Sequence, residues 1–206
     1  IALTEIDKEG NIVSCQFLAL PELVYSSTNR RDNLIGETAT EIVNIALSKG
    51  KGLVIESLDF VKKNKGKQFN RMSHNFVYRR LLESLERRSK KCGVAIKQVN
   101  PAYTSIIGKY KYATLNGLSF HQAAALVIAR RGIGFRERIP RKIQRLIESL
   151  ISELNNLLEA MEAKGKREVN VACDVKRLLA KLKNWPSIHS WSFWHAFNQS
   201  LRKVGV

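Results

Sequence analysis

The sequence has few acidic residues, few cysteines and no long hydrophobic run. Its 206 residues include 18 Asp and Glu against 35 Lys and Arg, which gives a formal net charge of +17. No stretch approaches the roughly 20 apolar residues that a membrane-spanning helix needs, so we expect no membrane partner. The hydrophobic fraction of 44% is typical of a soluble globular protein. With no signal peptide visible at the N-terminus, we expect a cytoplasmic protein.

The three cysteines, Cys15, Cys92 and Cys173, are far apart in the chain. No C-x-x-C pair and no Cys/His pair at zinc-finger spacing occurs, which excludes a zinc ribbon. An odd number of widely spaced cysteines is typical of free thiols in a reducing compartment.

The excess of positive charge predicts a polyanionic partner, and nucleic acid is the foremost candidate. Ribosomal-type binding, anionic membranes and simple solubility are the alternatives. Residues 61–91 contain eleven Lys or Arg and two acids, which predicts a surface that follows a phosphate backbone. The nucleic-acid contacts expected from this region are Lys62, Lys63, Lys65, Lys67, Arg71, Arg79 and Arg80. A solvated helix face is the alternative for each charge.

The pattern of apolar residues predicts an α/β arrangement for the first part of the chain. We expect a β-hairpin with its turn near Gly10, in which Asp7 is a turn residue. A helix over 33–48, a buried strand at Leu53–Ile55, a basic helix over 73–91 and a strand over 94–99 follow. A further helix over 118–131 is expected to be capped by Ser119.

Residues 105–116 are predicted to form a loop in which lysines alternate with tyrosines. Lys109, Tyr110 and Lys111 suit base stacking beside phosphate contacts, and the alternative is that the tyrosines pack on the core. Arg130 and Arg131, which end the next helix, are further expected contacts to nucleic acid.

The region after Pro140 is predicted to be helical. Apolar residues from Ile143 to Met161 alternate spacings of four and three, which indicates a heptad seam. We interpret the region as an antiparallel helical hairpin, with a dimeric coiled coil as the alternative. The aromatic segment 185–194 is expected to pack the tail down, and base stacking by Trp191 or Trp194 is the weaker alternative.

Glu56 follows the buried strand directly, and open α/β sheets bind ligands near the carboxyl ends of their strands. A buried carboxylate without a partner is costly. Glu56 is therefore expected to be paired, to bind a metal, or to point out at the edge of the sheet.

Three segments occur in an order that resembles a known family: Leu53–Phe60 (LVIESLDF), Val99–Ser105 (VNPAYTS) and Gly117–Gly132 (GLSFHQAAALVIARRG). Together they resemble the RuvC-like nuclease domain of TnpB/OrfB proteins from insertion sequences, relatives of type V CRISPR effectors. The similarity covers roughly residues 1–135. Within the family, the sequence resembles the TnpB-related branch more narrowly. It implies an RNase H-like (RuvC-type) mixed sheet flanked by helices over 1–138, followed by the helical hairpin and tail over 139–206.

The resemblance also implies a centre in which three acidic residues hold two Mg²⁺ ions for phosphodiester cleavage. Glu56 matches the second acid. His121 stands at the position of the third, with Gln122 beside it, although Mg²⁺ prefers oxygen ligands. The first acid is expected on a strand that precedes Ile1. Asp59 is an alternative ligand or a surface acid, and the zinc ribbon common in the family is absent.

These observations predict a transposon-associated protein that binds nucleic acid. The first hypothesis is a Mg²⁺-dependent DNA endonuclease, possibly RNA-guided, with Glu56 and His121 as catalytic and metal-binding residues and DNA and a guide RNA as partners. The second is a relative without nuclease activity that only binds nucleic acid. The third is a basic scaffold that oligomerises through the 143–161 seam.

Overall fold

The computed structural model describes residues 1–57, 69–163, 169–185 and 190–205. Its contacts divide the chain into two compact units, which are described one at a time. Unit 1 consists of Ile1–Ala102 and Ile128–Phe135, and unit 2 consists of Tyr103–Val127 and Arg136–Val206. This division differs from the predicted boundary near residue 138. Residues 103–127 belong to unit 2 because Ile107 and Val127 share a hydrophobic core with the C-terminal helices.

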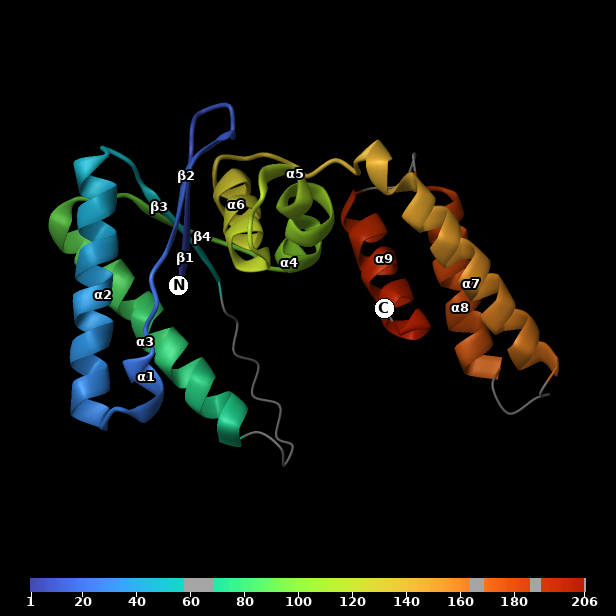
Figure 1. Ribbon diagram of the computed structural model, residues 1–206, viewed down its shortest axis with the longest axis horizontal. Coiled ribbons are helices and arrows are strands. Elements are labelled where there is room, and N and C mark those ends of the chain that lie inside the picture. Colours follow the sequence, from blue (N-terminus) through green and yellow to red (C-terminus); the bar gives the residue numbers. More distant parts are fainter. Residues whose placement is uncertain (58–68, 164–168, 186–189, 206) are drawn as a thin grey trace. The chain divides into compact units, whose positions relative to one another are not determined.

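Unit 1 begins with the predicted hairpin (Figure 1), formed by the antiparallel strands β1 (Ala2–Ile6) and β2 (Ile12–Phe17). Gly10 has φ +76° in its turn, a conformation that suits glycine because it has no Cβ. Asp7 Oδ1 accepts a hydrogen bond of 2.7 Å from the backbone N–H of Asn11. The hairpin and the turn role of Asp7 are confirmed.

The rest of unit 1 alternates helices with short strands: α1 (Glu22–Tyr25), α2 (Thr28–Ser48), β3 (Leu53–Glu56), α3 (Phe69–Cys92) and β4 (Ile96–Val99). Strands β3 and β4 pair in parallel, with Glu56 opposite Val99. Helix α2 begins earlier than predicted because its first turn is polar and carries no apolar periodicity. Helix α3 likewise begins at Phe69, before the predicted start at residue 73.

Strand β3 is covered on both faces, as its apolar run predicts. Ile55 is 9% exposed and belongs to a core with buried residues of α2 and α3. Because side chains alternate along a strand, the neighbouring Val54 points the other way, against Gly132 at the end of α6 (Phe120–Gly132). The parallel pairing and this double cover make β3 the centre of unit 1.

The hairpin is held through Glu5 to the residues that lead into β3. The carboxylate of Glu5 on β1 accepts hydrogen bonds from Lys49 Nζ at 2.6 Å and from Lys51 Nζ at 2.7 Å. The hydrogen bonds from Lys49, Lys51 and Ser14 lower the pKa of Glu5 to about 2. This side chain is 14% exposed, so the two ion pairs are partly shielded from water.

Unit 2 starts with a helical segment where the sequence predicted a loop, and that prediction is wrong. α4 (Thr104–Ile107), a π-helical turn η1 (Gly108–Ala113) and α5 (Thr114–Asn116) run directly into one another. Ile107 and Ala113 are buried. A Cβ on Gly108 would lie 2.7 Å from the carbonyl carbon of Ala123. The missing side chain of Gly108 lets this segment approach α6 closely, and packing therefore outweighs the polar local sequence.

The C-terminal part of unit 2 contains the 3-10 turn η2 (Arg141–Ile143) and three helices, α7 (Gln144–Ala163), α8 (Val169–Lys183) and α9 (Ser190–Val204). The helices lie side by side (Figure 1). The predicted seam is buried within the chain at Ile143, Ile147, Leu150 and Leu154. The helical hairpin α7–α8 is confirmed, and the seam is occupied by residues of the same chain rather than left exposed for a second copy.

The aromatic tail is a third helix that packs through its apolar face. Phe193, Trp194 and Phe197 are at most 2% exposed, and the Phe193 and Phe197 rings stack with centroids 5.5 Å apart. The expected packing role is confirmed. Base stacking by Trp194 is excluded because its ring is buried.

The chain is thus a mixed α/β protein that is mostly helical. Its four described strands form two separate pairs, β1–β2 and β3–β4. The single mixed sheet of an RNase H-like fold is not seen among these residues, so that assignment stays a prediction.

The contact between Gly132 and Val54 predicts that Gly132→Ala destabilises unit 1. An added Cβ would lie 2.7 Å from Cγ1 and 3.0 Å from Cβ of Val54, and overpacking of this kind costs about 1–3 kcal/mol. Gly36→Ala is the matched control, because a Cβ there meets nothing within 4 Å. It is expected to stabilise helix α2 by about 0.5–1 kcal/mol. Denaturant unfolding of both variants checks the pair, and equal effects would contradict the packing of β3.

Candidate nucleic-acid interface

Glu56 is paired with a tyrosine rather than exposed at the edge of the sheet. Its side chain is half-buried, and it accepts a hydrogen bond from the hydroxyl of Tyr78 on α3. Burial is the main cause that raises the pKa of Tyr78, and the hydrogen bond and charge of Glu56 raise it further. The structure therefore places a neutral phenol against the carboxylate.

His121 and Gln122 lie in unit 2, whereas Glu56 lies in unit 1. His121 is exposed on the first turn of α6. Gln122 forms a capping box with Ser119: its Oε1 accepts the backbone N–H of Ser119 at 3.0 Å, and Ser119 Oγ accepts the backbone N–H of Gln122 at 3.3 Å. The predicted cap is confirmed, and the side chain of Gln122 has a structural partner.

The described residues do not fit a two-metal centre. Within them, no group of three or more His, Cys, Asp or Glu side chains lies close enough to hold a metal ion. Glu56 supplies one carboxylate, which is hydrogen-bonded to the phenol of Tyr78. Asp59 lies outside the described residues. Because Mg²⁺ requires several hard oxygen ligands, no catalytic step can be built from this set.

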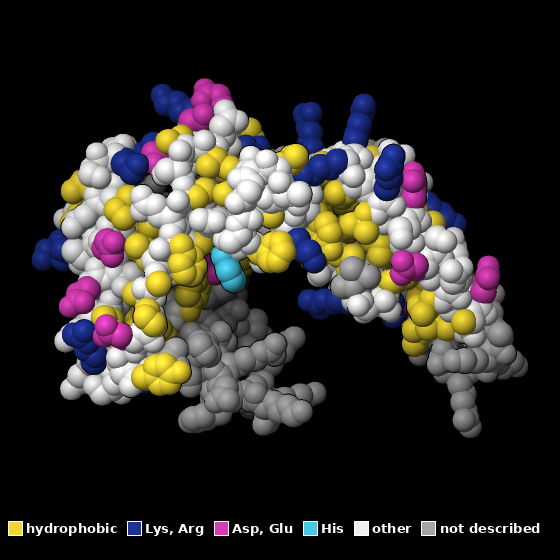
Figure 2. Space-filling model, in the orientation of Figure 1, with side chains coloured by type: hydrophobic (Ala, Val, Ile, Leu, Met, Phe, Trp, Pro, Cys, Tyr) yellow, Lys and Arg dark blue, Asp and Glu magenta, His cyan; other side chains and the backbone are white. Residues whose placement is uncertain are grey.

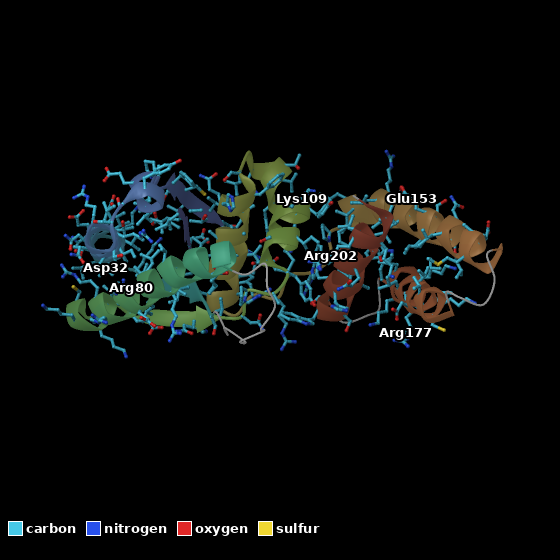
Figure 3. All side chains as sticks on the ribbon, turned by 90° about the horizontal axis from the view of Figure 1, so that it is seen from below. Asp32, Arg80, Lys109, Glu153, Arg177 and Arg202 are labelled. Carbon is cyan, nitrogen blue, oxygen red and sulfur yellow. The ribbon has the colours of Figure 1, made fainter. Side chains whose placement is uncertain are left out.

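Several predicted contacts lie on α3 or just before it. Lys62, Lys63, Lys65 and Lys67 fall outside the described residues, and Arg71 lies in α3 without a described side chain. Arg79 Nε bonds Glu83 at 2.8 Å, and Arg80 pairs with Asp32 of α2 (Figure 3). Both arginines therefore have acidic partners on the surface of unit 1.

Arg130 and Arg131 hold backbone carbonyl groups of unit 1 in place. Arg130 donates to the carbonyl of Gly10 in the hairpin turn and lies 4.4 Å from the ring centroid of Phe135. Arg131 donates to the carbonyls of Asn100 and Ala102. These contacts give both arginines a structural role, and their predicted contact with nucleic acid stays a prediction.

Of the residues Lys109 to Tyr112 in η1, Lys109 is exposed, whereas the other three contact other residues of unit 2. Tyr110 packs edge-on against Phe197 with centroids 5.2 Å apart. Lys111 Nζ and the Tyr112 hydroxyl both donate to Glu137 at 2.6 Å. The packing alternative therefore describes the tyrosines, whereas Lys109 is exposed at the surface (Figure 3).

A basic segment over 136–145 was missed by the predictions above. It contains five Lys or Arg within ten positions and one acid, Glu137. All five cations are exposed, whereas Glu137 is 6% exposed and bonded to Lys111. The charges that this segment exposes are therefore all positive, and Lys and Arg side chains project where it leads into α7 (Figure 2). The cations are Arg136, Arg138, Arg141, Lys142 and Arg145. Their density in the sequence is the signal that could have found them.

Lys142 lies against η1, close to the charge of Lys111. Its Nζ donates to the carbonyl of Lys111 at 2.8 Å. Burial, and then the positive charge of Lys111, lower the pKa of Lys142. A bound anion nearby would favour the charged form of Lys142.

Comparisons with known protein families, with curated proteins and with solved structures found no match. The resemblance to TnpB/OrfB proteins therefore rests on the sequence segments quoted above. No helix in the described part of the chain is long and apolar enough to cross a membrane.

The contact between Tyr78 and Glu56 predicts an abnormal titration of Tyr78. The neutral phenol is expected to persist above the usual tyrosine pKa of about 10. Glu56→Gln should lower that pKa without restoring the usual value, because burial is the larger cause. NMR titration of ¹³C-labelled tyrosine, with the signal assigned through Tyr78→Phe, measures both effects. An ordinary pKa in the unmodified protein, or no change in Glu56→Gln, would contradict the contact.

Proposed function

We propose that this protein binds nucleic acid through the cationic surface of residues 136–145, as part of a TnpB-like, transposon-associated protein. The proposal is carried by one observation. Five cations of this segment are exposed, while its single acid is buried and paired internally.

The internal pairing explains why the segment suits phosphates. Lys111 pairs with Glu137 inside the protein. The negative charge of this acid therefore does not weaken the attraction between the neighbouring cations and an anion. Neutralising phosphates releases counterions from the nucleic acid, which supplies a large part of such binding free energy. The net charge of +17 adds long-range attraction for the same partner.

The proposal predicts that Arg138→Gln, Arg141→Gln and Arg145→Gln together weaken binding and flatten its salt dependence. Each lost contact with a single-stranded phosphate lowers the slope of log K against log salt by about 0.7, or about 2 for all three. Fluorescence anisotropy of labelled DNA and RNA from about 50 to about 200 mM salt measures the change.

The matched control removes three charges from another exposed face of unit 2. Arg177, Lys181 and Lys183 lie exposed on α8, and changing all three to Gln gives the same net charge as the test variant. The control should retain most of the slope. Equal losses in the two triple variants would mean that net charge alone attracts the nucleic acid.

Phosphodiester cleavage is the second candidate, and the position of Glu56 favours it. This carboxylate lies at the carboxyl end of a parallel strand in the centre of unit 1, where α/β proteins commonly bind ligands. The described residues do not complete a metal centre, so cleavage needs metal ligands from outside them. Binding of nucleic acid has no such requirement.

A nicking assay with supercoiled DNA and Mg²⁺ or Mn²⁺ tests this second candidate. Glu56→Gln is expected to abolish metal-dependent nicking, because the amide carries no charge for the cation. Glu153→Gln, an exposed acid on α7, is the control and should leave nicking unchanged. Nicking that survives in Glu56→Gln would exclude this residue from the reaction.

A further inference from the structure

Phe120 is a large aromatic side chain that the fold leaves in solvent beside a cation. It is 59% exposed, and Lys109 Nζ lies 5.8 Å from its ring centroid. The same ammonium lies 5.0 Å from the centroid of Tyr110, whose ring is fixed against Phe197. An exposed ring beside a positioned ammonium is a surface that can contact a base and its phosphate together.

The backbone around this pair is held in place from both sides. Gly108, next to Lys109, approaches the backbone of Ala123 so closely that a Cβ would lie 2.7 Å from its carbonyl carbon. Ser119, next to Phe120, is fixed by the capping box with Gln122. The Phe120 ring and the Lys109 ammonium therefore belong to two elements, α6 and η1, that are packed together before any ligand arrives.

Hydrogen bonds join the cationic segment 136–145 to η1. Lys111, two residues beyond Lys109 in η1, donates to Glu137 Oε2 at 2.6 Å and to the carbonyl of Arg138 at 3.1 Å. Lys142 Nζ donates back to the carbonyl of Lys111 at 2.8 Å. Through η1, the exposed ring and the cationic segment are linked within unit 2.

We propose that Phe120, with Lys109 beside it, is a stacking site for an unpaired base of a single-stranded nucleic acid whose phosphates lie on residues 136–145. The argument for this occupant is complementarity of charge and shape. The cations attract a polyanion, and the open face of Phe120 accepts the flat base that only an unpaired strand presents. The inference rests on the proposed function and specifies its substrate as single-stranded.

Anisotropy titrations with three probes of equal length, about 16 nucleotides, test the site. The probes are a mixed-sequence single strand, the corresponding duplex, and a strand in which abasic sites replace the bases. Phe120→Ala is expected to weaken binding of the single strand at least fivefold, since base stacking contributes about 1–3 kcal/mol. Binding of the duplex and of the abasic strand should change less than twofold, and Phe120→Trp should restore binding of the single strand.

Phe17→Ala is the matched control. Phe17 is 60% exposed, close to the 59% of Phe120, but lies on the hairpin of unit 1. Its loss should leave all three affinities unchanged, and melting curves of each variant verify the fold. A Phe120→Ala variant that weakens all three probes equally, or none of them, would overturn the stacking site.

The outcomes also separate this inference from the function it rests on. If the unmodified protein binds none of the probes, the proposed function fails and the stacking site with it. If the triple arginine variant weakens binding while Phe120→Ala has no effect on the single strand, the proposed function stands and the stacking site alone is wrong.

Discussion

The buried carboxylate of Glu137 accepts hydrogen bonds of 2.6 Å from Lys111 and from Tyr112, and the cationic surface of unit 2 depends on this contact. The backbone carbonyl of Glu137 also accepts a hydrogen bond of 3.4 Å from the indole N–H of Trp194 in α9. Removing one partner of a buried ion pair costs about 3–5 kcal/mol, so the pairing strongly favours one position of the segment that follows α6. The contact joins η1, α9 and the connection to α7. With the single acid of residues 136–145 turned inward, the five cations around it face solvent.

Unit 1 is organised differently, around a short strand covered on both faces. The burial of Ile55 and the fit of Gly132 over Val54 fix β3 between α2 and α3 on one side and the end of α6 on the other. Glu56 ends this strand and is half-buried, so it needs a polar partner, and the Tyr78 phenol supplies one. A carboxylate satisfied by a neutral donor is stable without a metal. The two units thus differ in what they offer a ligand: unit 2 has a cationic surface, and the strand-end carboxylate of unit 1 is already hydrogen-bonded to a phenol.

Patterns within one element could be predicted from the sequence, and contacts between distant elements could not. The apolar run at Leu53–Ile55, the turn at Gly10, the heptad seam from Ile143 and the Ser119 cap all depend on neighbouring residues, and all were found. The helical segment 104–116 was predicted as a loop because its order depends on Gly108 meeting Ala123 in another helix. The internal pairing of Lys111 with Glu137, 26 residues away, carries no local signal. For the same reason Tyr110 was predicted as a stacking residue, while the exposed Phe120 was not. The partner of Glu56 lies on α3, so the sequence left open whether it was paired, metal-bound or at the surface.

The central claim is that nucleic acid lies on the surface formed by residues 136–145 and by η1 with the start of α6. Hydrogen–deuterium exchange of the intact protein, with and without a saturating single-stranded oligonucleotide, tests it most directly, because exchange reports local protection without altering any residue. The account predicts slower exchange on binding in peptides that cover 106–122 and 136–145, and unchanged exchange in α8. Protection confined to α8 or to unit 1, with 106–122 and 136–145 unchanged in the bound state, would contradict it.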